Sequence, residues 1–275
     1  LHTPQSFASV ALSVKHFLIR LLRIKHALSR VCPARARDPD RQKNNIIMLV
    51  VAAAFGLVSG FTGGTSRPLT QRVRSAPVAS DSGLGLRDYE MPREDGLATI
   101  HFCMEGSHVT SWVCGGEEQL FLSKEAKFTA EKLAIRGGIP ICWPAFNERN
   151  LKAGKHGIVR TSERWNIHAA DTDPDGTPWM VLEHETCYLE VDPTTSKIVG
   201  YHYEEPSAAE VADAVVVPST LKMRYEVKPT SLRVEMQVEN GGDTAFDFST
   251  VLHSYFSVNT MPVTVRGLQG KSGLK

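Results

Sequence analysis

The first 80 residues of the sequence almost lack acidic side chains. They contain 12 of the 31 Lys and Arg residues but only two of the 30 acids, Asp38 and Asp40. Residues 81–275 therefore hold 19 basic and 28 acidic side chains, a net charge of −9. This asymmetry indicates a basic leader in front of an acidic domain. Because an acidic domain is a poor general binder of nucleic acid, we expect no nucleic-acid partner.

Cysteines are few, and their spacing forms no recognisable pattern. There are five, an odd number, with no CxxC pair, which argues against a disulfide framework and against a zinc ribbon. His101, Cys103, His108 and Cys114 lie close together in sequence, but their spacing matches no usual set of metal ligands. We favour buried thiols and surface histidines there, and expect no metal site.

An apolar run long enough to cross a bilayer is also missing. Residues 46–61, IIMLVVAAAFGLVSGF, are nearly uncharged but shorter than the about 20 residues that a membrane helix needs. The run is typical of the apolar region of a signal peptide. Residues 62–80 contain Arg, Ser and Thr without an acid, as transit peptides do. Since the first methionine is Met48, we interpret residues 1–47 as upstream or non-native sequence.

These features predict a leader over residues 1–80. A signal segment followed by a transit segment resembles the bipartite leader of algae with secondary plastids, so we expect a plastid location. A cytoplasmic location and the secretory pathway are the alternatives, and residues 46–61 as a short membrane anchor are another. Once the leader is removed, we expect no stable membrane association.

From residue 97 onward the dominant period of apolar residues is two, as in half-buried strands. Residues 231–239 alternate strictly, residues 240–243 supply turn side chains, and residues 245–256 form the second strand of a hairpin. The one helical candidate is residues 207–215. Many short strands separated by turns predict an all-β fold, an antiparallel β-sandwich. Further predicted strands are 98–103, 109–114, 165–169, 179–184, 221–227 and 263–266.

Two stretches contain residues suited to binding a ligand. In residues 136–144, RGGIPICWP, paired glycines after Arg136 allow a ligand to approach the backbone closely; a tight turn with a surface arginine is the alternative. In residues 154–162, GKHGIVRTS, Lys155, His156 and Arg160 offer three cations within six residues. Arginine suits bidentate binding of phosphate, although an ordinary basic surface loop has the same composition.

A third stretch, residues 248–256, contains a histidine on a predicted strand. Alternation places Phe246, Phe248, Leu252 and Phe256 on an apolar face, and Asp247, Ser249, His253 and Tyr255 on the opposite face. Because the pKa of histidine lies near working pH, His253 is a candidate general acid or base. A structural role is the alternative.

Taken in order, four blocks resemble a family. The blocks SHVTSWVCGGEEQLFLS, RGGIPICWPAF, KHGIVRTSERW and LHSYF, which begin at residues 107, 136, 155 and 252, are similar to those of hexose-6-phosphate mutarotases. These are the glucose-6-phosphate 1-epimerases of the aldose 1-epimerase superfamily. The resemblance covers about 190 residues.

The resemblance implies a galactose-mutarotase-like β-sandwich that binds sugar in a cleft on its concave side. It further implies an isomerase that interconverts the α and β anomers of glucose 6-phosphate or related aldohexose 6-phosphates, without metal or other cofactor. His253 matches the acid that protonates the ring oxygen, and His156 matches a sugar-binding histidine. Arg136 and Arg160 match substrate-binding arginines and suit the phosphate. Lys155 replaces the glutamine usual in the family, and could reach the phosphate.

In the resembling family, the glutamate base and a substrate-binding aspartate follow the LHSYF block by a long stretch. This sequence ends at GLQGKSGLK. We therefore expect residues 81–275 to be the N-terminal two-thirds of the domain, with the sandwich incomplete at its C-terminus, and we expect this chain to be inactive as it stands. We also expect a monomer. The alternatives are a non-catalytic sugar-phosphate-binding protein on the same fold, a mutarotase of unphosphorylated sugars, and a membrane-anchored interaction module.

Overall fold

In the computed structural model the chain folds almost wholly as strands. The structure describes residues 77–80, 86–129, 132–146, 155–211 and 213–258, of which 127–129 and 132–134 by backbone alone, and the backbone of β1 (His16–Leu21) and β2 (Asn45–Val58). Among these residues the only helical element is a 3-10 turn, η1 (Glu105–Ser107). All pairs of named strands are antiparallel, so the predicted all-β antiparallel class is confirmed.

A five-stranded sheet contains its strands in the order of the sequence. Its last connection is a tight hairpin through Gly115 and Gly116, both with positive φ, as a two-residue hairpin turn requires. Its strands are β3 (Val78–Ser80), β4 (Asp88–Pro92), β5 (Ala98–Cys103), β6 (His108–Cys114) and β7 (Glu117–Glu118).

A seven-stranded sheet is built around the long strand β15 (Val215–Lys228). Along one edge β15 pairs with β16 over its whole second half, and its other edge is shared by β13 and β12. Strand β14 extends β13, β11 extends β12, and the backbone of β1 lies along β16. These strands are β11 (Trp165–Thr172), β12 (Pro178–His184), β13 (Cys187–Val191), β14 (Ile198–His202) and β16 (Ser231–Asn240).

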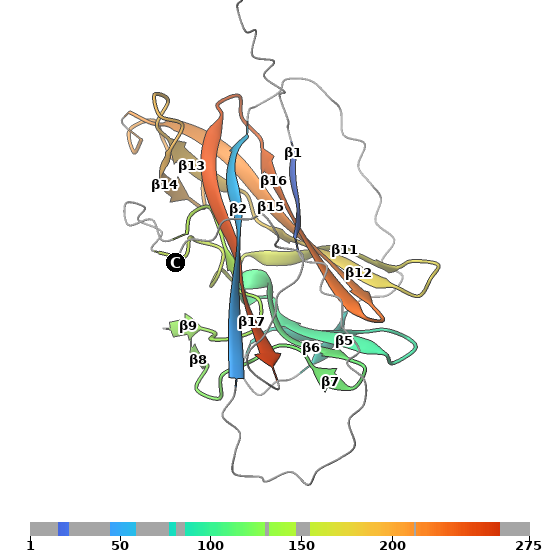
Figure 1. The fold of residues 1–275 in the computed structure, drawn as a ribbon. Helices are drawn as coiled ribbons and strands as arrows, with labels where there is room; N and C mark the ends of the chain where they lie inside the picture. Colours follow the sequence, from blue (N-terminus) through green and yellow to red (C-terminus); the bar gives the residue numbers. More distant parts are fainter. Residues whose placement is uncertain are drawn as a thin grey trace, which may run out of the picture.

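The strand β17 (Phe246–Val258) extends from one large sheet to the other (Figure 1). Near its start Asp247 bridges Lys197, next to β14, and near its end Phe256 bridges Leu120, beyond β7. Its edges pair with β2 and with the short β10 (Ile141–Cys142). A separate hairpin consists of β8 (Lys127–Thr129) and β9 (Lys132–Ala134).

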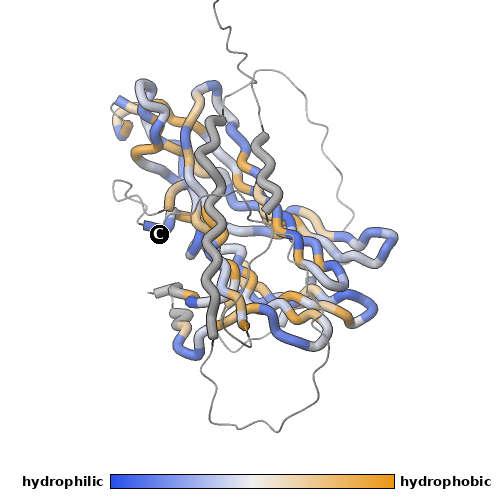
Figure 2. The backbone as a smooth tube through the Cα atoms, in the orientation of Figure 1, coloured by the Kyte–Doolittle hydropathy of each residue, from blue (hydrophilic) through white to orange (hydrophobic). Residues whose placement is uncertain are grey.

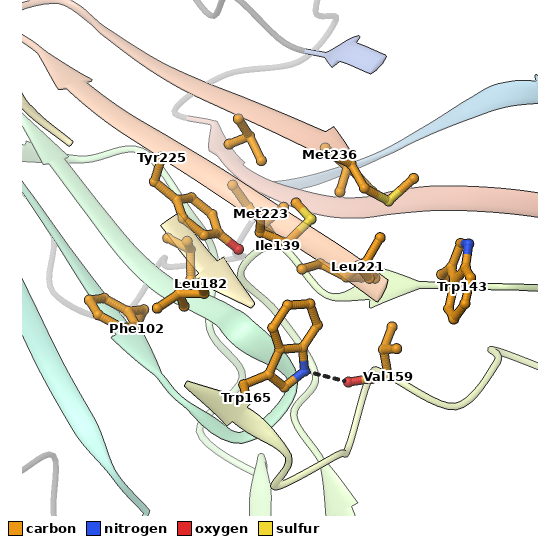
Figure 3. Close-up of a cluster of buried hydrophobic side chains, with 14 of the residues drawn as sticks. Phe102, Ile139, Trp143, Val159, Trp165, Leu182, Leu221, Met223, Tyr225 and Met236 are labelled. Carbon is orange, nitrogen blue, oxygen red and sulfur yellow. Dashed lines mark hydrogen bonds between the residues drawn. The ribbon is translucent and has the colours of Figure 1, made fainter. Parts of the chain in front are cut away.

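The core lies between the two large sheets. Figure 3 shows Tyr225, Met223 and Leu221 of β15 in this layer, with Leu182 between Tyr225 and Phe102 of β5. The turns between β4 and β5 and between β11 and β12 are hydrophilic and lie away from this core (Figure 2). Removing apolar area from water in this layer is the main stabilising contribution to the fold.

The predicted strands within the described residues coincide with observed ones, namely β5, β6, β11, β12, β15, β16 and β17. The predicted hairpin of residues 231–239 with 245–256 is wrong, because β16 and β17 lie in different sheets and do not pair. The predicted strand 263–266 lies outside the described residues. The helix predicted over residues 207–215 is wrong. The backbone N–H and the hydroxyl of Ser207 both donate to the carboxylate of Glu210, closing a single turn, and β-branched residues then begin β15.

Three strands, β1, β2 and β3, fall within residues 1–80, the predicted leader. The backbone of β2 covers most of the signal-like segment 46–61 and pairs with β17. Removal of the leader in the living cell stays a prediction. Among the described segments there is no helix with the length and apolar content needed to cross a bilayer.

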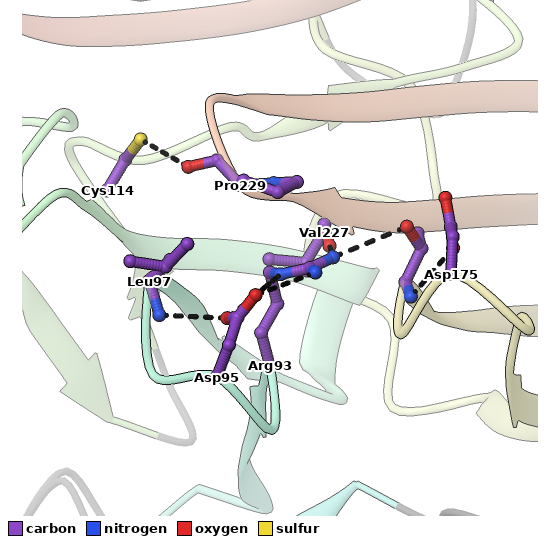
Figure 4. Close-up of polar contacts among 8 residues, drawn as sticks. Arg93, Asp95, Leu97, Cys114, Asp175, Val227 and Pro229 are labelled. Atoms are coloured by element: carbon purple, nitrogen blue, oxygen red, sulfur yellow. Dashed lines mark hydrogen bonds and ion pairs between the residues drawn. The ribbon is translucent and has the colours of Figure 1, made fainter.

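Arg93 joins the two large sheets. It follows β4, its side chain is only 5% exposed, and it pairs with Asp95 in the same turn. Its Nη1 donates to the carbonyl of Val227 in β15 at 3.1 Å and to the hydroxyl of Thr177 at 3.3 Å, just before β12 (Figure 4). One buried guanidinium therefore satisfies acceptors from three segments.

We expect Arg93→Ala to lower the free energy of unfolding by about 2–4 kcal/mol, because buried acceptors lose their donor. Arg164→Ala is the control: Arg164 and its partner Glu185 are 43% and 48% exposed, and we expect a loss of at most about 1 kcal/mol. Urea unfolding of both variants measures the difference. Equal losses would contradict a structural role of Arg93.

Candidate active site

Residues 136–146, here called the central segment, lie along one edge of β17. The backbone N–H groups of Ser249, His253 and Tyr255 donate to the carbonyls of Pro144, Pro140 and Gly138 at 2.8–2.9 Å. The strand pair β10–β17 forms the middle of this contact. The second and fourth of the sequence blocks therefore lie side by side.

The other side of the central segment contacts the loop 155–162. The backbone N–H of Ile158 donates to the carbonyl of Trp143 at 2.9 Å, and Trp143 bridges Gly157. Gly157 has φ +75°, and a Cβ there would lie 2.1 Å from the Trp143 oxygen. Only glycine allows this approach, which fixes the position of the preceding residue, His156.

The central segment thus brings two histidines from distant blocks together. The rings of His156 and His253 are 6.2 Å apart between centroids, at an interplanar angle of 75°. The ring of Phe146 lies 5.8 Å from His156 and 5.9 Å from His253, and Tyr255 lies 5.1 Å from His253. These four rings form an aromatic cluster at the end of the central segment.

His253 is 8% exposed, and His156 is half-buried. The Nδ1 of His253 is enclosed, with no hydrogen bond beyond a weak contact with its own carbonyl group. Because Nδ1 is enclosed, Nε2 is the ring atom that can meet a ligand. This nitrogen can donate or accept a proton, as acid–base chemistry requires.

The pKa of both histidines is lowered from the ordinary value. For His253 and for His156 the loss of hydration on burial is the largest cause. The charge of Arg160 lowers both pKa values further, and that of His156 is also lowered by the charges of His253 and Lys155. Both imidazoles are therefore neutral at pH 7.

Arg160 supplies positive charge beside this pair. Its Nη2 donates to the carbonyl of Ile135 at 3.2 Å, so its guanidinium is anchored at the start of the central segment. Its charge lowers the pKa values of both site histidines. It also lowers the pKa of the Cys142 thiol, against the larger rise that burial causes. An anion bound here would interact favourably with this charge.

Arg136 and Lys155, the two other predicted substrate-binding residues, are exposed. The carbonyl of Arg136 accepts a hydrogen bond from the backbone of Ser123 at 2.9 Å, which holds the start of the central segment. Lys155 is next to His156, and its charge lowers the pKa of that histidine. The structure thus groups Arg160, His156 and His253 closely, with Lys155 adjoining, and leaves the side chain of Arg136 at the surface.

A further histidine, His108, contacts the central segment at its paired glycines. It is fully buried, and its Nε2 donates to the carbonyl of Gly137 at 2.8 Å. Since a carbonyl only accepts, Nε2 carries the proton, and burial lowers the pKa of His108 to about 3. A Cβ on Gly138 would lie 2.2 Å from the carbonyl of Val109, so β6 packs directly against the paired glycines.

Sequence reasoning gave no role to Phe146 or Ser249. Phe146 stood within a recognised block, and Ser249 was predicted on the same face of its strand as His253. The predicted division of that strand into an apolar and a polar face is wrong for residues 250–254, which are all buried. Other segments cover both faces there, and the pairing with β2 shifts register after Phe248.

In the histidine and cysteine group at residues 101–114, the thiols of Cys103 and Cys114 are buried as expected, but the expected surface position is wrong for His108, which is buried as well. The thiol of Cys103 donates to the carbonyls of Glu105 and His108, and His108 bonds to Gly137. Over the described ranges there is no group of three or more His, Cys, Asp or Glu residues that could hold a metal ion.

Comparison with known proteins finds similarity to sugar 1-epimerases. The model of the family described as aldose 1-epimerase matches residues 92–272. A protein of Escherichia coli K12 named "Putative glucose-6-phosphate 1-epimerase" is 31% identical over 172 residues, which are 61% of this chain and 48% of that protein. A protein of the same name from Cenchrus ciliaris is 33% identical over 172 residues, 60% of this chain and 45% of that protein.

The chain spans about half the length of the curated relatives it matches. A solved structure described as a "putative mutarotase" from Salmonella typhimurium aligns with 66% of this chain and 97% of its own, at 14% identity and a TM-score of 0.32. A TM-score this low carries no argument about the fold.

We expect Gly157→Ala to destabilise the protein by at least about 2 kcal/mol more than Gly96→Ala. Both glycines have φ near +70°, but nothing lies within 4 Å of a Cβ at Gly96, so this control reports the backbone cost alone. Urea unfolding measures both variants. Equal losses would show that the close contact with Trp143 does not hold the loop.

We expect Arg160→Gln to raise the pKa values of His156 and His253, because a repelling positive charge is removed. Arg164→Gln should raise only the pKa of His184, on which the charge of Arg164 acts. NMR titration of the histidine ring signals reads all three. Unchanged pKa values of the pair in Arg160→Gln would contradict the proximity of this charge.

Proposed function

The chain belongs to the aldose 1-epimerase family, and from this we propose that the protein interconverts the α and β anomers of hexose 6-phosphates. Glucose 6-phosphate is the proposed substrate, since the relatives from Escherichia coli and Cenchrus ciliaris carry the name of a glucose-6-phosphate 1-epimerase. The observation that carries the proposal is the meeting of His156 and His253 beside the charge of Arg160.

Mutarotation needs two proton transfers and no redox step. The C1–O5 bond breaks as a proton is delivered to O5 and another is removed from the C1 hydroxyl, which leaves a carbonyl at C1. Rotation about C1–C2 followed by the reverse transfers closes the ring as the other anomer. The requirement is therefore one group that donates at O5 and one that accepts at the C1 hydroxyl.

We assign the donor role at O5 to His253. Its enclosed Nδ1 and its position in a rigid strand support this role, because a fixed imidazole presents one nitrogen in one direction. We assign His156 to the sugar hydroxyls near the reacting carbon, which its distance from His253 allows. By the family resemblance, the base that takes the proton from the C1 hydroxyl is a glutamate, and we assign no residue of this sequence to that role.

The 6-phosphate is assigned to Arg160, with Lys155 and Arg136 as outer cations. A guanidinium suits the geometry of a phosphate group. Residues 81–275 carry a net charge of −9, so an anionic substrate needs such a local positive region. Bound phosphate would also offset the repulsion that Arg160 exerts on the two histidines.

The test measures anomer exchange of glucose 6-phosphate by NMR exchange spectroscopy with the full-length protein. We expect His253→Gln to lower kcat by at least about 100-fold, because the proton donor is removed. Arg160→Gln should lower kcat/KM for glucose 6-phosphate about 10- to 100-fold more than for glucose. Arg164→Gln, whose arginine pairs with Glu185 at the surface, is the control and should keep its activity.

Binding of glucose 6-phosphate without anomer exchange would refute the enzymatic proposal and favour a sugar-phosphate-binding protein. Equal loss on both sugars in Arg160→Gln would refute the assignment of the phosphate to this arginine.

A further inference from the structure

Phe146 is the only described residue whose ring contacts both site histidines. Its centroid lies 5.8 Å from that of His156 at an interplanar angle of 67°, and 5.9 Å from that of His253 at 54°. With the two imidazoles 6.2 Å apart, the three rings form a nearly equilateral triangle. Edge-on and tilted contacts at these separations are favourable for aromatic rings.

Ser249 fixes the position of Phe146. The backbone N–H of Phe146 donates to the hydroxyl of Ser249 at 2.9 Å, and the backbone N–H of Ser249 donates to the carbonyl of Pro144 at 2.8 Å. Ser249 lies on β17, four residues before His253. The same strand therefore carries His253, and through Ser249 it bonds to the backbone of both Phe146 and Pro144.

The ring of Phe146 covers the side of each imidazole that faces it. An apolar ring at this distance leaves no room for water between itself and either histidine. Loss of hydration on burial is also the largest cause of the lowered pKa values of both histidines. Since Phe146 is half-buried and ends the central segment, its removal would open the pair to water from this side.

We propose that Phe146 is a positioning residue of the site: held by Ser249, its ring fixes the separation of His156 and His253 and keeps water from the space beside them. The proposal deepens the proposed function, and its relevance to turnover rests on that function. The geometric and electrostatic part stands on the structure alone. Phe146 has no ionisable group, so it takes no part in the proton transfers themselves.

Among the residues that the structure describes, few charged and titratable groups surround the pair. His253 faces Arg160, His156 and Tyr255, and His156 additionally faces Lys155. The central segment contributes Cys142, whose thiol has a pKa raised by burial to about 11. The sequence of β2, which pairs with β17 next to His253, contains no titratable side chain. None of these groups changes when Phe146 is replaced.

The test compares Phe146→Ala, Phe146→Leu and Ser249→Ala in the full-length protein by NMR titration of the histidine rings. We expect Phe146→Ala to raise the pKa values of both site histidines towards the ordinary value, since water returns. Phe146→Leu keeps an apolar side chain at this position, so the pKa values of both histidines should stay almost as low as in the wild-type protein. Ser249→Ala should raise both pKa values by a smaller amount, and it keeps the test decisive if Phe146→Ala does not fold.

Tyr203→Ala is the matched control, because Tyr203 is an aromatic residue whose ring lies 6.1 Å from His184, outside the site. It should leave both site histidines unchanged. Unchanged titration of His156 and His253 in folded Phe146→Ala, or a rise in only one of them, would overturn the proposal. So would unchanged titration in Ser249→Ala where Phe146→Ala does not fold.

Kinetics separate this proposal from the proposed function. If the protein exchanges anomers, Phe146→Ala should lower kcat about 10-fold or more with a smaller change in KM, and should move the limb of the pH profile set by the histidines to higher pH. Phe146→Leu should recover the profile. If the wild-type protein exchanges no anomers, the proposed function fails, whereas the NMR titrations still decide the role of Phe146.

Discussion

The hydrogen bonding of residues 136–146 to both of their neighbours is the constraint on which the arrangement of the site depends. On one side the backbone of β17 donates to alternate carbonyls of this segment, and on the other the loop 155–162 donates to Trp143. Glycine is needed at 157, 137 and 138, because a side chain there would overlap neighbouring backbone. His156 and His253 are almost a hundred positions apart in the sequence, and this segment contacts the backbone on both sides, next to each of them.

The chemistry of the pair follows from its surroundings. Burial removes water from both imidazoles, and the positive charge of Arg160 disfavours a positive charge on either ring. Both effects lower the pKa values, so both imidazoles are neutral near pH 7. A neutral imidazole takes up a proton, and the imidazolium so formed gives it back, as a reversible isomerisation demands. The region most able to attract an anion thus lies within a domain of negative net charge, where the overall field gives no help.

Much of the fold could be predicted from local pattern. Strict alternation in residues 231–239 predicts a strand, which is present as β16. The predicted hairpin with residues 245–256 is wrong, because β16 pairs with β15 and β1, whereas β17 pairs with β10 and β2. The predicted helix 207–215 failed because the turn capped by Ser207 and Glu210 does not continue, and the valines at 215–217 pair with β13 instead. The parts that could not be predicted depend on contacts between distant residues, such as Arg93 reaching Val227 or Ser249 holding Phe146. Alternation shows which face a side chain occupies, but not which segment will cover that face.

Ligand contact with both histidines at once is the most direct test of this account. Glucose 6-phosphate would be titrated into the full-length protein while the NMR signals of the histidine rings are followed. The account predicts that His156 and His253 respond together, with one apparent affinity, while His168 and His202, which pair with glutamates on the seven-stranded sheet, do not. A response of only one histidine of the pair, or of neither while the sugar phosphate binds, would contradict it.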